Sequence, residues 1–222
     1  MKGKIFNAQE VQAIIAGTKT MFREVIKPRI KVENYKLDDG SGIGMEILLE
    51  ECPYQVGQKI FVKERFFEEI HPDSLRKNGK IHYDASCDYE VIKVDGDGFQ
   101  IFYKDGTPAS PWKSPVHMEQ EHSRLTLEIT DVKVERLASI SEEDCKKEGI
   151  GYTGGWNGED YDDGEYYFGK LEESKDGMNW ENEMFKYPDL AFAELWNATH
   201  KKPEEKFEVN PFVWVVNFKI NK

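Results

Sequence analysis

Two charged residues stand where helices are expected to end. Lys19 follows Gly17, the glycine that stops one predicted helix, and Glu148 directly precedes Gly149, which closes another. The C-terminal end of a helix carries partial negative charge, so a lysine is favourable there and a glutamate is not. Glu148 therefore needs a cation or a hydrogen-bond donor as a partner. We predict that Lys19 and Glu148 face each other across one cleft, paired directly or through a water; solvent and neighbouring lysines are the alternative partners.

The segment after the first predicted helix is the one basic stretch of the chain. Thr18, Thr20 and Arg23 lie close to Lys19, and further cations follow as far as Lys31. Hydroxyl groups and cations at a helix end can hold a small anion or a carbonyl group. The same pattern also fits an ordinary helix end with a favourable lysine.

Other kinds of site have less support in the sequence. His117 and His122 are an odd number of residues apart, which would place them on opposite faces of a strand, and no acid or cysteine completes a metal set. Ser123 lacks the surroundings of an activated nucleophile, and no glycine-rich phosphate loop is present. We expect neither a metal site nor a cofactor.

Charge limits the class of partner. The chain has 30 Lys and Arg against 42 Asp and Glu, a net charge of −12. Binding to a nucleic-acid duplex depends on basic groups that displace counterions, so a broad duplex-binding surface is improbable. Residues 156–183 alone hold ten acids and two lysines. This acidic segment suggests an alternative function, as a module that imitates nucleic acid or docks on a host protein.

Composition indicates a folded protein of a reducing compartment. Of the residues, 39% are hydrophobic, and no apolar run approaches the roughly 20 residues that cross a bilayer. Three cysteines without a close pair argue against a disulfide framework. We therefore expect a cytoplasmic protein with no membrane partner.

The residue pattern predicts an α+β fold that is mainly β. Short runs rich in β-branched and aromatic residues alternate with turn residues, which favours a closed or nearly closed sheet flanked by short helices. We predict one domain over 1–222, with a hairpin insertion at 68–115 and an acidic loop insertion at 151–184. Helices are expected over 7–17 and 141–149 and after Pro188, and strands over Met45–Glu51, Lys59–Phe67, Lys80–Asp84, Phe99–Lys104, Arg124–Leu137 and Phe212–Ile220.

Five segments together resemble a known family. They are Ala16 to Thr20, Gln55 to Glu64, Ser123 to Ile129, Ile140 to Ile150 and Asn210 to Val216. In this order they resemble the ASCH domain, a branch of the PUA-like β-barrels, in the long form found in bacteriophages and prophages. The resemblance covers roughly half of the chain and leaves out both insertions.

The resemblance implies recognition of a nucleotide, a modified nucleoside or short single-stranded RNA in a cleft beside the barrel. Lys19 and Glu148 match the catalytic lysine and glutamate of small bacterial members that hydrolyse acetylcytidine without a metal. The matching threonine position holds Phe22, so we expect that amidohydrolase activity to be absent or feeble. An amidohydrolase or ribonuclease reaction remains open. We expect Thr20, Arg23, Lys63 and Arg124 to line the ligand site.

Overall fold

The computed structural model has an α+β architecture of short helices, a mixed sheet and hairpins. It describes residues 1–27, 45–70, 77–84, 89–94, 98–103, 112–154, 164–168 and 184–221. Most of the predicted acidic insertion 151–184, and parts of the hairpin insertion 68–115, lie outside the described residues. The chain divides into two compact units, the first formed by Met1–Gln12, Lys59–Leu127 and Asn221–Lys222, the second by Ala13–Gln58 and Glu128–Ile220.

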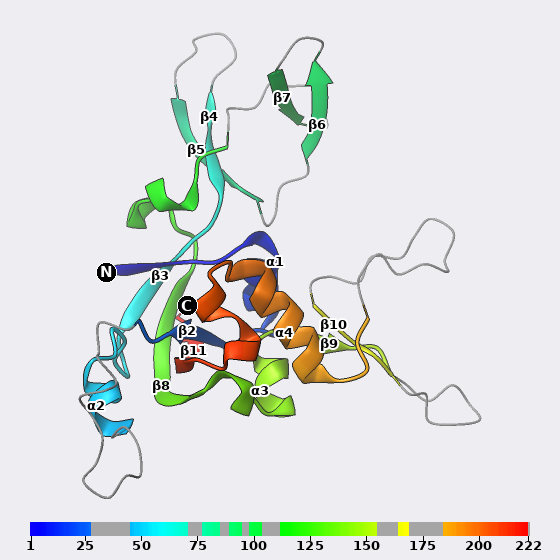
Figure 1. Ribbon diagram of the computed structural model, residues 1–222. Helices are drawn as coiled ribbons and strands as arrows, with labels where there is room; N and C mark the ends of the chain where they lie inside the picture. The colour runs from blue at the N-terminus through cyan, green and yellow to red at the C-terminus, as the bar shows by residue number, and fades with distance from the viewer. Residues whose placement is uncertain are drawn as a thin grey trace, which may run out of the picture. The chain divides into compact units, whose positions relative to one another are not determined.

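Figure 1 shows the helices and strands. The α-helices are α1 (Ala8–Ala16), α2 (Met45–Glu50), α3 (Glu142–Lys147) and α4 (Pro188–Thr199). The strands are β1 (Lys2–Ile5), β2 (Met21–Val25), β3 (Lys59–Lys63), β4 (Phe66–Ile70), β5 (Lys77–Tyr83), β6 (Tyr89–Val94), β7 (Gly98–Tyr103), β8 (Thr126–Arg136), β9 (Ile150–Tyr152), β10 (Tyr166–Phe168) and β11 (Phe212–Ile220). Short 3-10 turns include Pro115–His117 and Gln120–His122.

The first unit is built from β1 paired parallel to β3 and from two hairpins. At the start of α1, Asn7 Oδ1 accepts from the Glu10 amide at 2.8 Å, and Glu10 Oε2 accepts from the Asn7 amide at 2.9 Å. This reciprocal capping box satisfies two amides at the helix start, and it confirms the predicted helix start. Within 68–115, where we expected a single extra hairpin, β4 pairs with β5 and β6 pairs with β7.

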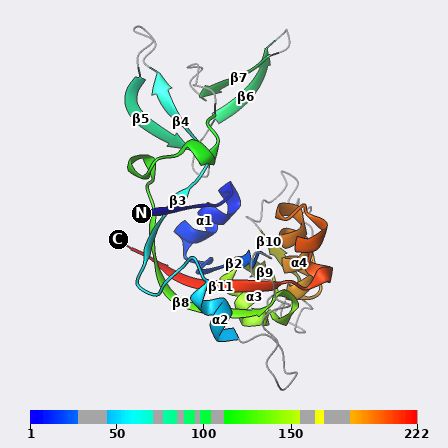
Figure 2. The same cartoon turned by 60° about the vertical axis from the view of Figure 1, so that its left-hand side comes forward.

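The second unit holds a hydrophobic core. Strand β11 pairs antiparallel with β2, so that Val215 lies opposite Arg23. Figures 1 and 2 show α3 and α4 side by side, next to β9 and β10. Apolar side chains from these elements bury one another, and they include Met21, Val25, Leu137, Cys145, Ile150, Phe192, Trp196, Val213 and Val215.

The prediction of a strand at Met45–Glu51 is wrong, because Met45–Glu50 forms helix α2. Methionine, leucine and glutamate are strong helix formers, and the segment holds no valine, threonine or aromatic residue. Packing supports the helix, since Leu48 is fully buried and its carbonyl accepts from Trp214 Nε1 at 3.0 Å.

The expected closed sheet is not found among the described strands. The main sheet has five strands in the order β1-β3-β8-β11-β2, so β1 and β2 are its edges and do not pair with each other. Both edge strands are short, with four and five residues, and each pairs with one neighbour only. Among the strands that the structure describes, the sheet is therefore open and mixed rather than closed into a barrel.

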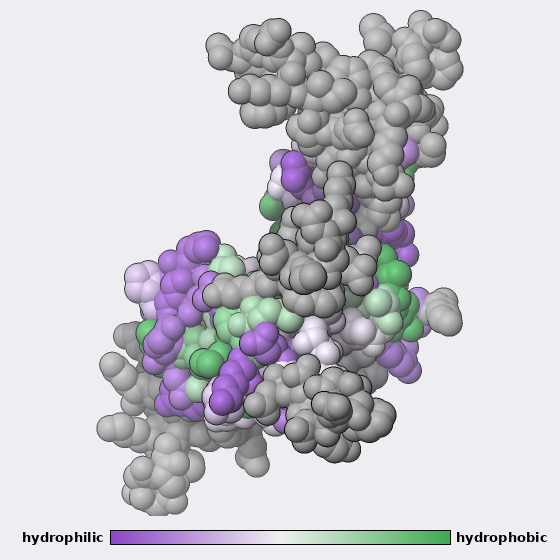
Figure 3. Space-filling view, turned by 90° about the vertical axis from the view of Figure 1, so that its right-hand side faces the viewer, coloured by the Kyte–Doolittle hydropathy of each residue, from purple (hydrophilic) through white to green (hydrophobic). Residues whose placement is uncertain are grey.

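The described surface is mixed in character. On the face drawn in Figure 3, hydrophobic patches are bordered by hydrophilic residues. No helix in the described part of the chain is long and apolar enough to cross a membrane.

Candidate functional site

The end of α1 brings Lys19 into place. Gly17 has a φ of +78°, a left-handed conformation that favours glycine, and it turns the chain out of the helix. The amides of Thr18 and Lys19 then both donate to the carbonyl of Ala13, at 2.9 and 3.1 Å. Lys19 continues into an isolated antiparallel bridge with Glu148. The turn at Gly17 therefore places Lys19 next to Glu148.

The end of α3 places Glu148 in the same way. Ser141 caps the start of α3, with its hydroxyl accepting from the Asp144 amide at 3.1 Å. Glu148 is the C-terminal cap, and Gly149 follows with a φ of +99°. The glutamate thus sits at the negative end of the helix, where its carboxylate needs a cation.

Lys19 is that cation. Its Nζ lies 2.7 Å from Glu148 Oε2 and also donates to the Glu148 carbonyl at 2.9 Å. Only 3% of Lys19 and 5% of Glu148 is exposed. The neighbouring Lys146 and Lys147 pair with Glu142 and Glu143 on the surface of α3, and Lys147 Nζ also approaches Asp144 Oδ1 at 3.8 Å. The predicted ion pair is confirmed, and it is nearly closed to solvent. The cleft expected between the two residues stays a prediction.

Arg23 joins this pair from strand β2. Its Nη1 donates to Glu148 Oε1 at 2.8 Å, and its Nη2 donates to Glu135 Oε1 at 2.7 Å and to Asp144 Oδ2 at 3.3 Å. The Arg23 side chain has no exposed surface. Burial alone would lower the pKa of Arg23, but its bonds to Glu148 and Glu135 outweigh burial and raise it.

A third cation completes the group at its outer edge. Lys133 Nζ lies 3.0 Å from Glu135 Oε2 and 3.2 Å from Asp144 Oδ2. Burial would lower the pKa of Lys133, whereas hydrogen bonds to these two carboxylates raise it. Three cations and three carboxylates therefore meet with balanced charge. We call them the ion-pair cluster: Lys19, Arg23, Lys133, Glu135, Asp144 and Glu148.

One nitrogen of this cluster has no partner. Arg23 Nε is buried and makes no hydrogen bond within the described part of the chain. The Arg23 guanidinium carbon lies 5.5 Å from the centre of the Phe192 ring. An unpaired buried donor costs about 1–3 kcal/mol, so it is unusual in a native core and calls for an explanation.

Phe22 faces the other side of β2. Successive side chains of a strand point to opposite faces, so residue 22 points away from Arg23. Its ring packs edge-to-face on Tyr54 at 5.2 Å, and Tyr54 donates to Glu24 on the same face. A side chain at position 22 therefore points toward Tyr54 and away from the ion-pair cluster.

The other predicted ligand-binding residues have different surroundings. Thr20 belongs to the second unit and bonds there through its backbone, donating to the Lys147 carbonyl at 2.8 Å. Lys63 and Arg124 belong to the first unit. Lys63 donates to the Val116 carbonyl, and Arg124 forms a two-pronged ion pair with Glu64 at 2.8 and 2.9 Å.

Lys133, Glu135 and Asp144 were missed at the level of the sequence. Alternation along a strand places Lys133 and Glu135 on one face of β8, which is a usable signal for their pairing. Nothing in the sequence connects them to Arg23, more than 100 residues away. Among the described residues, no group of three His, Cys, Asp or Glu side chains could hold a metal ion.

Comparison with known proteins adds no family assignment. The chain matches no protein-family model, no curated protein and no solved structure. The geometry of the ion-pair cluster is therefore the main basis for a functional proposal.

Proposed function

We propose that this chain is an ASCH/PUA-like cytoplasmic protein whose ion-pair cluster recognises a nucleotide, a modified nucleoside or short single-stranded RNA. Support comes from the meeting of Lys19 and Glu148, which stand 129 residues apart and are the two positions that the resemblance implies. Arg23, a second cation expected near them, donates to the same carboxylate.

The observation that carries the proposal is the unpaired Nε of Arg23. A buried N–H group without an acceptor is costly to keep, and such groups often mark a site that a ligand completes. The matching acceptor is a carbonyl oxygen, such as those of a pyrimidine base or an acyl group. Because Lys19 and Glu148 are nearly covered, ligand entry requires at least one of these side chains to move.

The charge balance of the cluster sets the size of the ligand. Each cation is already paired with a carboxylate, so every phosphate that binds must compete with a protein carboxylate. The net charge of −12 further opposes a long polyanion. A nucleoside, a mononucleotide or a strand of a few nucleotides is the class of ligand that fits.

Recognition without efficient amide hydrolysis is the activity we propose. The family constellation needs a hydroxyl at position 22, but Phe22 packs on Tyr54 on the opposite face of β2. Loss of a positioned hydroxyl commonly lowers such rates by about two to four orders of magnitude. The ion-paired Lys19 ammonium is suited to holding a ligand electrostatically.

Isothermal titration tests this proposal with cytidine, cytidine monophosphate, a four-nucleotide RNA and a 20-base-pair duplex. We expect the first three to bind and the duplex not to bind. Lys19→Met should weaken binding by about tenfold or more, which corresponds to about 1.4 kcal/mol. The matched control is Lys146→Met, an exposed lysine of α3 that pairs with Glu142 outside the cluster.

Two results would contradict the proposal. One is equal binding by wild type and Lys19→Met, with circular dichroism showing that both are folded. The other is tight duplex binding that weakens steeply with salt, because that behaviour requires many phosphate contacts.

A further inference from the structure

Arg124 shows how an arginine of this chain pairs with a carboxylate when no lysine competes. Its Nε donates to Glu64 Oε1 at 2.8 Å, and its Nη2 donates to Glu64 Oε2 at 2.9 Å. Nε–H and one N–H of Nη2 leave the guanidinium group from the same edge, so one carboxylate can accept from both. In the described part of the chain, Glu64 is bound by Arg124 and by no lysine.

Arg23 makes only half of such a pair with Glu135. Glu135 Oε1 accepts from Arg23 Nη2 at 2.7 Å, but Arg23 Nε is buried and has no partner among the described residues. The second carboxylate oxygen, Glu135 Oε2, lies 3.0 Å from Lys133 Nζ. One carboxylate is thus shared between an arginine and a lysine, and the oxygen that would complete the two-pronged pair is bound to the lysine.

Lys133 also binds the other carboxylate that Arg23 Nη2 contacts. Asp144 Oδ2 lies 3.2 Å from Lys133 Nζ and 3.3 Å from Arg23 Nη2. The lysine therefore holds one carboxylate of strand β8 and one of helix α3. Without Lys133, two cations of the cluster would face three carboxylates, and the charge of Arg23 would attract the released oxygen of Glu135.

We infer that Lys133 is a positioning residue, which holds Glu135 Oε2 away from Arg23 and thereby keeps Arg23 Nε unpaired for a ligand. This inference rests on the proposed function and extends it to a residue that need not touch the ligand. The Lys133 side chain is 43% exposed, the largest exposed fraction in the ion-pair cluster, so its replacement disturbs the core little.

NMR of the arginine Nε–H groups, recorded without added ligand, tests the inference on the full chain. A hydrogen bond to a carboxylate moves an N–H proton signal downfield. We expect the Arg23 signal to move downfield in Lys133→Met, toward the position of the Arg124 signal. Lys133→Arg keeps a cation at this position and should leave the Arg23 signal in place. The matched control is Lys219→Met, which removes an exposed lysine that pairs with Glu128 of the same strand β8.

Calorimetry with cytidine measures the consequence for binding. Cytidine is neutral, so the loss of one positive charge does not by itself repel it. Lys133→Met should weaken cytidine binding by about tenfold, because the ligand must first break a charge-assisted hydrogen bond between Glu135 and Arg23 Nε. Lys133→Arg should bind cytidine as wild type does.

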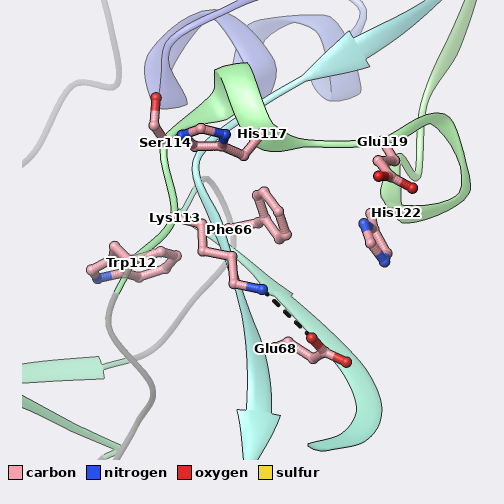
Figure 4. A pocket seen from close by; sticks show the side chains of 8 residues that line it. All are labelled: Phe66, Glu68, Trp112, Lys113, Ser114, His117, Glu119 and His122. Carbon is pink, nitrogen blue, oxygen red and sulfur yellow. Dashed lines mark ion pairs between the residues drawn. The ribbon is translucent and has the colours of Figure 1, made fainter.

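A pocket in the first unit provides a control for the place of binding. It has a volume of about 740 Å³, and Figure 4 shows its lining, which includes Phe66, Trp112 and Lys113. Lys113 Nζ lies 3.5 Å from Glu68 Oε2. Lys113→Met should leave cytidine binding unchanged. Loss of binding in Lys113→Met, with normal binding in Lys133→Met, would assign the ligand to this pocket and overturn the inference.

The inference is also overturned if the Arg23 signal of Lys133→Met stays at its wild-type position, or if Lys219→Met moves it equally. Adding Glu135→Leu to Lys133→Met removes the acceptor and should reverse the shift; a shift that persists would show that Glu135 is not the group held back. Equal cytidine binding by Lys133→Met and wild type would exclude a role in ligand binding.

The two proposals fail in different ways. Absence of cytidine binding in wild type would refute the proposed function. The Arg23 signal recorded without ligand would still decide whether Lys133 keeps Nε unpaired.

Discussion

Arg23 holds the ion-pair cluster together, because among the described residues it alone contacts all three carboxylates. It donates to Glu148, Glu135 and Asp144 from a side chain with no exposed surface. Burying charges is costly, and such a group is stable only while each charge keeps its partners. Removing the central cation leaves three carboxylates close together without their shared partner.

The first prediction follows from this arrangement. Arg23→Met should lower the free energy of unfolding by about 3–5 kcal/mol, the usual cost of breaking a buried ion pair from one side. Lys146→Met removes an exposed pair and should cost less than about 1 kcal/mol. Urea unfolding measures both values, and an Arg23→Met loss as small as that of the control would refute the central role of Arg23.

The second prediction concerns pH. Burial raises the pKa of the Cys145 thiol to about 12, although Arg23 acts to lower it. An unfolded cysteine ionises near pH 8.5, so the folded state keeps a proton that the unfolded chain loses. This contribution to stability is complete below about pH 8.5, falls as the pH rises above it, and is lost by about pH 12.

Between pH 8 and pH 10 this thiol should lower the free energy of unfolding by about 1–2 kcal/mol. Cys145→Ala removes the contribution of the thiol, so the free energy of unfolding of the variant should fall less than that of wild type between pH 8 and pH 10. Urea unfolding at both pH values gives the comparison. Parallel pH dependence of the two proteins would show that the thiol does not contribute.

The sequence predicted part of the cluster, and the reason is local. Lys19 and Glu148 lie at the C-terminal ends of helices, which carry partial negative charge. A glutamate there needs a cation, and a lysine there is a suitable partner, so the pair could be predicted from the sequence. Arg23 was expected near them as one cation of a basic segment. Glu135 and Lys133 were missed, because their place beside Arg23 depends on how β8 packs near β2 and α3, which no local pattern encodes.

At the scale of elements, helix α3 places two members of the ion-pair cluster: Asp144 lies within the helix and Glu148 is its C-terminal cap. The Ser141 hydroxyl caps the first turn, and Glu148 closes the last. Ser141→Ala should lower the free energy of unfolding by about 1 kcal/mol, the usual value of such a cap. Ser139→Ala, at an exposed serine two residues earlier in the chain, is the control and should change stability little. Equal losses in urea unfolding would contradict the role of the cap.

Other elements show where sequence patterns succeed and fail. The strand predicted over Phe212–Ile220 is confirmed as β11, because a continuous run of β-branched and aromatic residues is distinctive. The strand prediction for Met45–Glu50 failed because the periodicity of a short apolar run does not distinguish a helix from a strand. No closed barrel is found among the described strands, and strand patterns could not predict this because closure depends on which edge strands pair, a property of the whole sheet.

At the scale of the whole molecule, charge and the geometry of the cluster are the basis for proposing a small ligand. The net charge of −12 opposes extended nucleic acids, and the six members of the ion-pair cluster balance one another. Within the described part of the chain, the buried side-chain donor of the cluster that has no hydrogen-bond partner is Arg23 Nε. We propose that a ligand carbonyl accepts a hydrogen bond from this donor.

NMR of the arginine Nε–H groups tests that claim most directly. The Arg23 signal is assigned by its loss in Arg23→Lys and is followed while cytidine monophosphate is added. We predict that it shifts with a saturation curve matching the calorimetric affinity, while the signal of Arg136, whose Nη1 donates to the Asn210 carbonyl, stays in place. Binding of cytidine monophosphate without a change in the Arg23 signal, or no binding at all, would contradict the account.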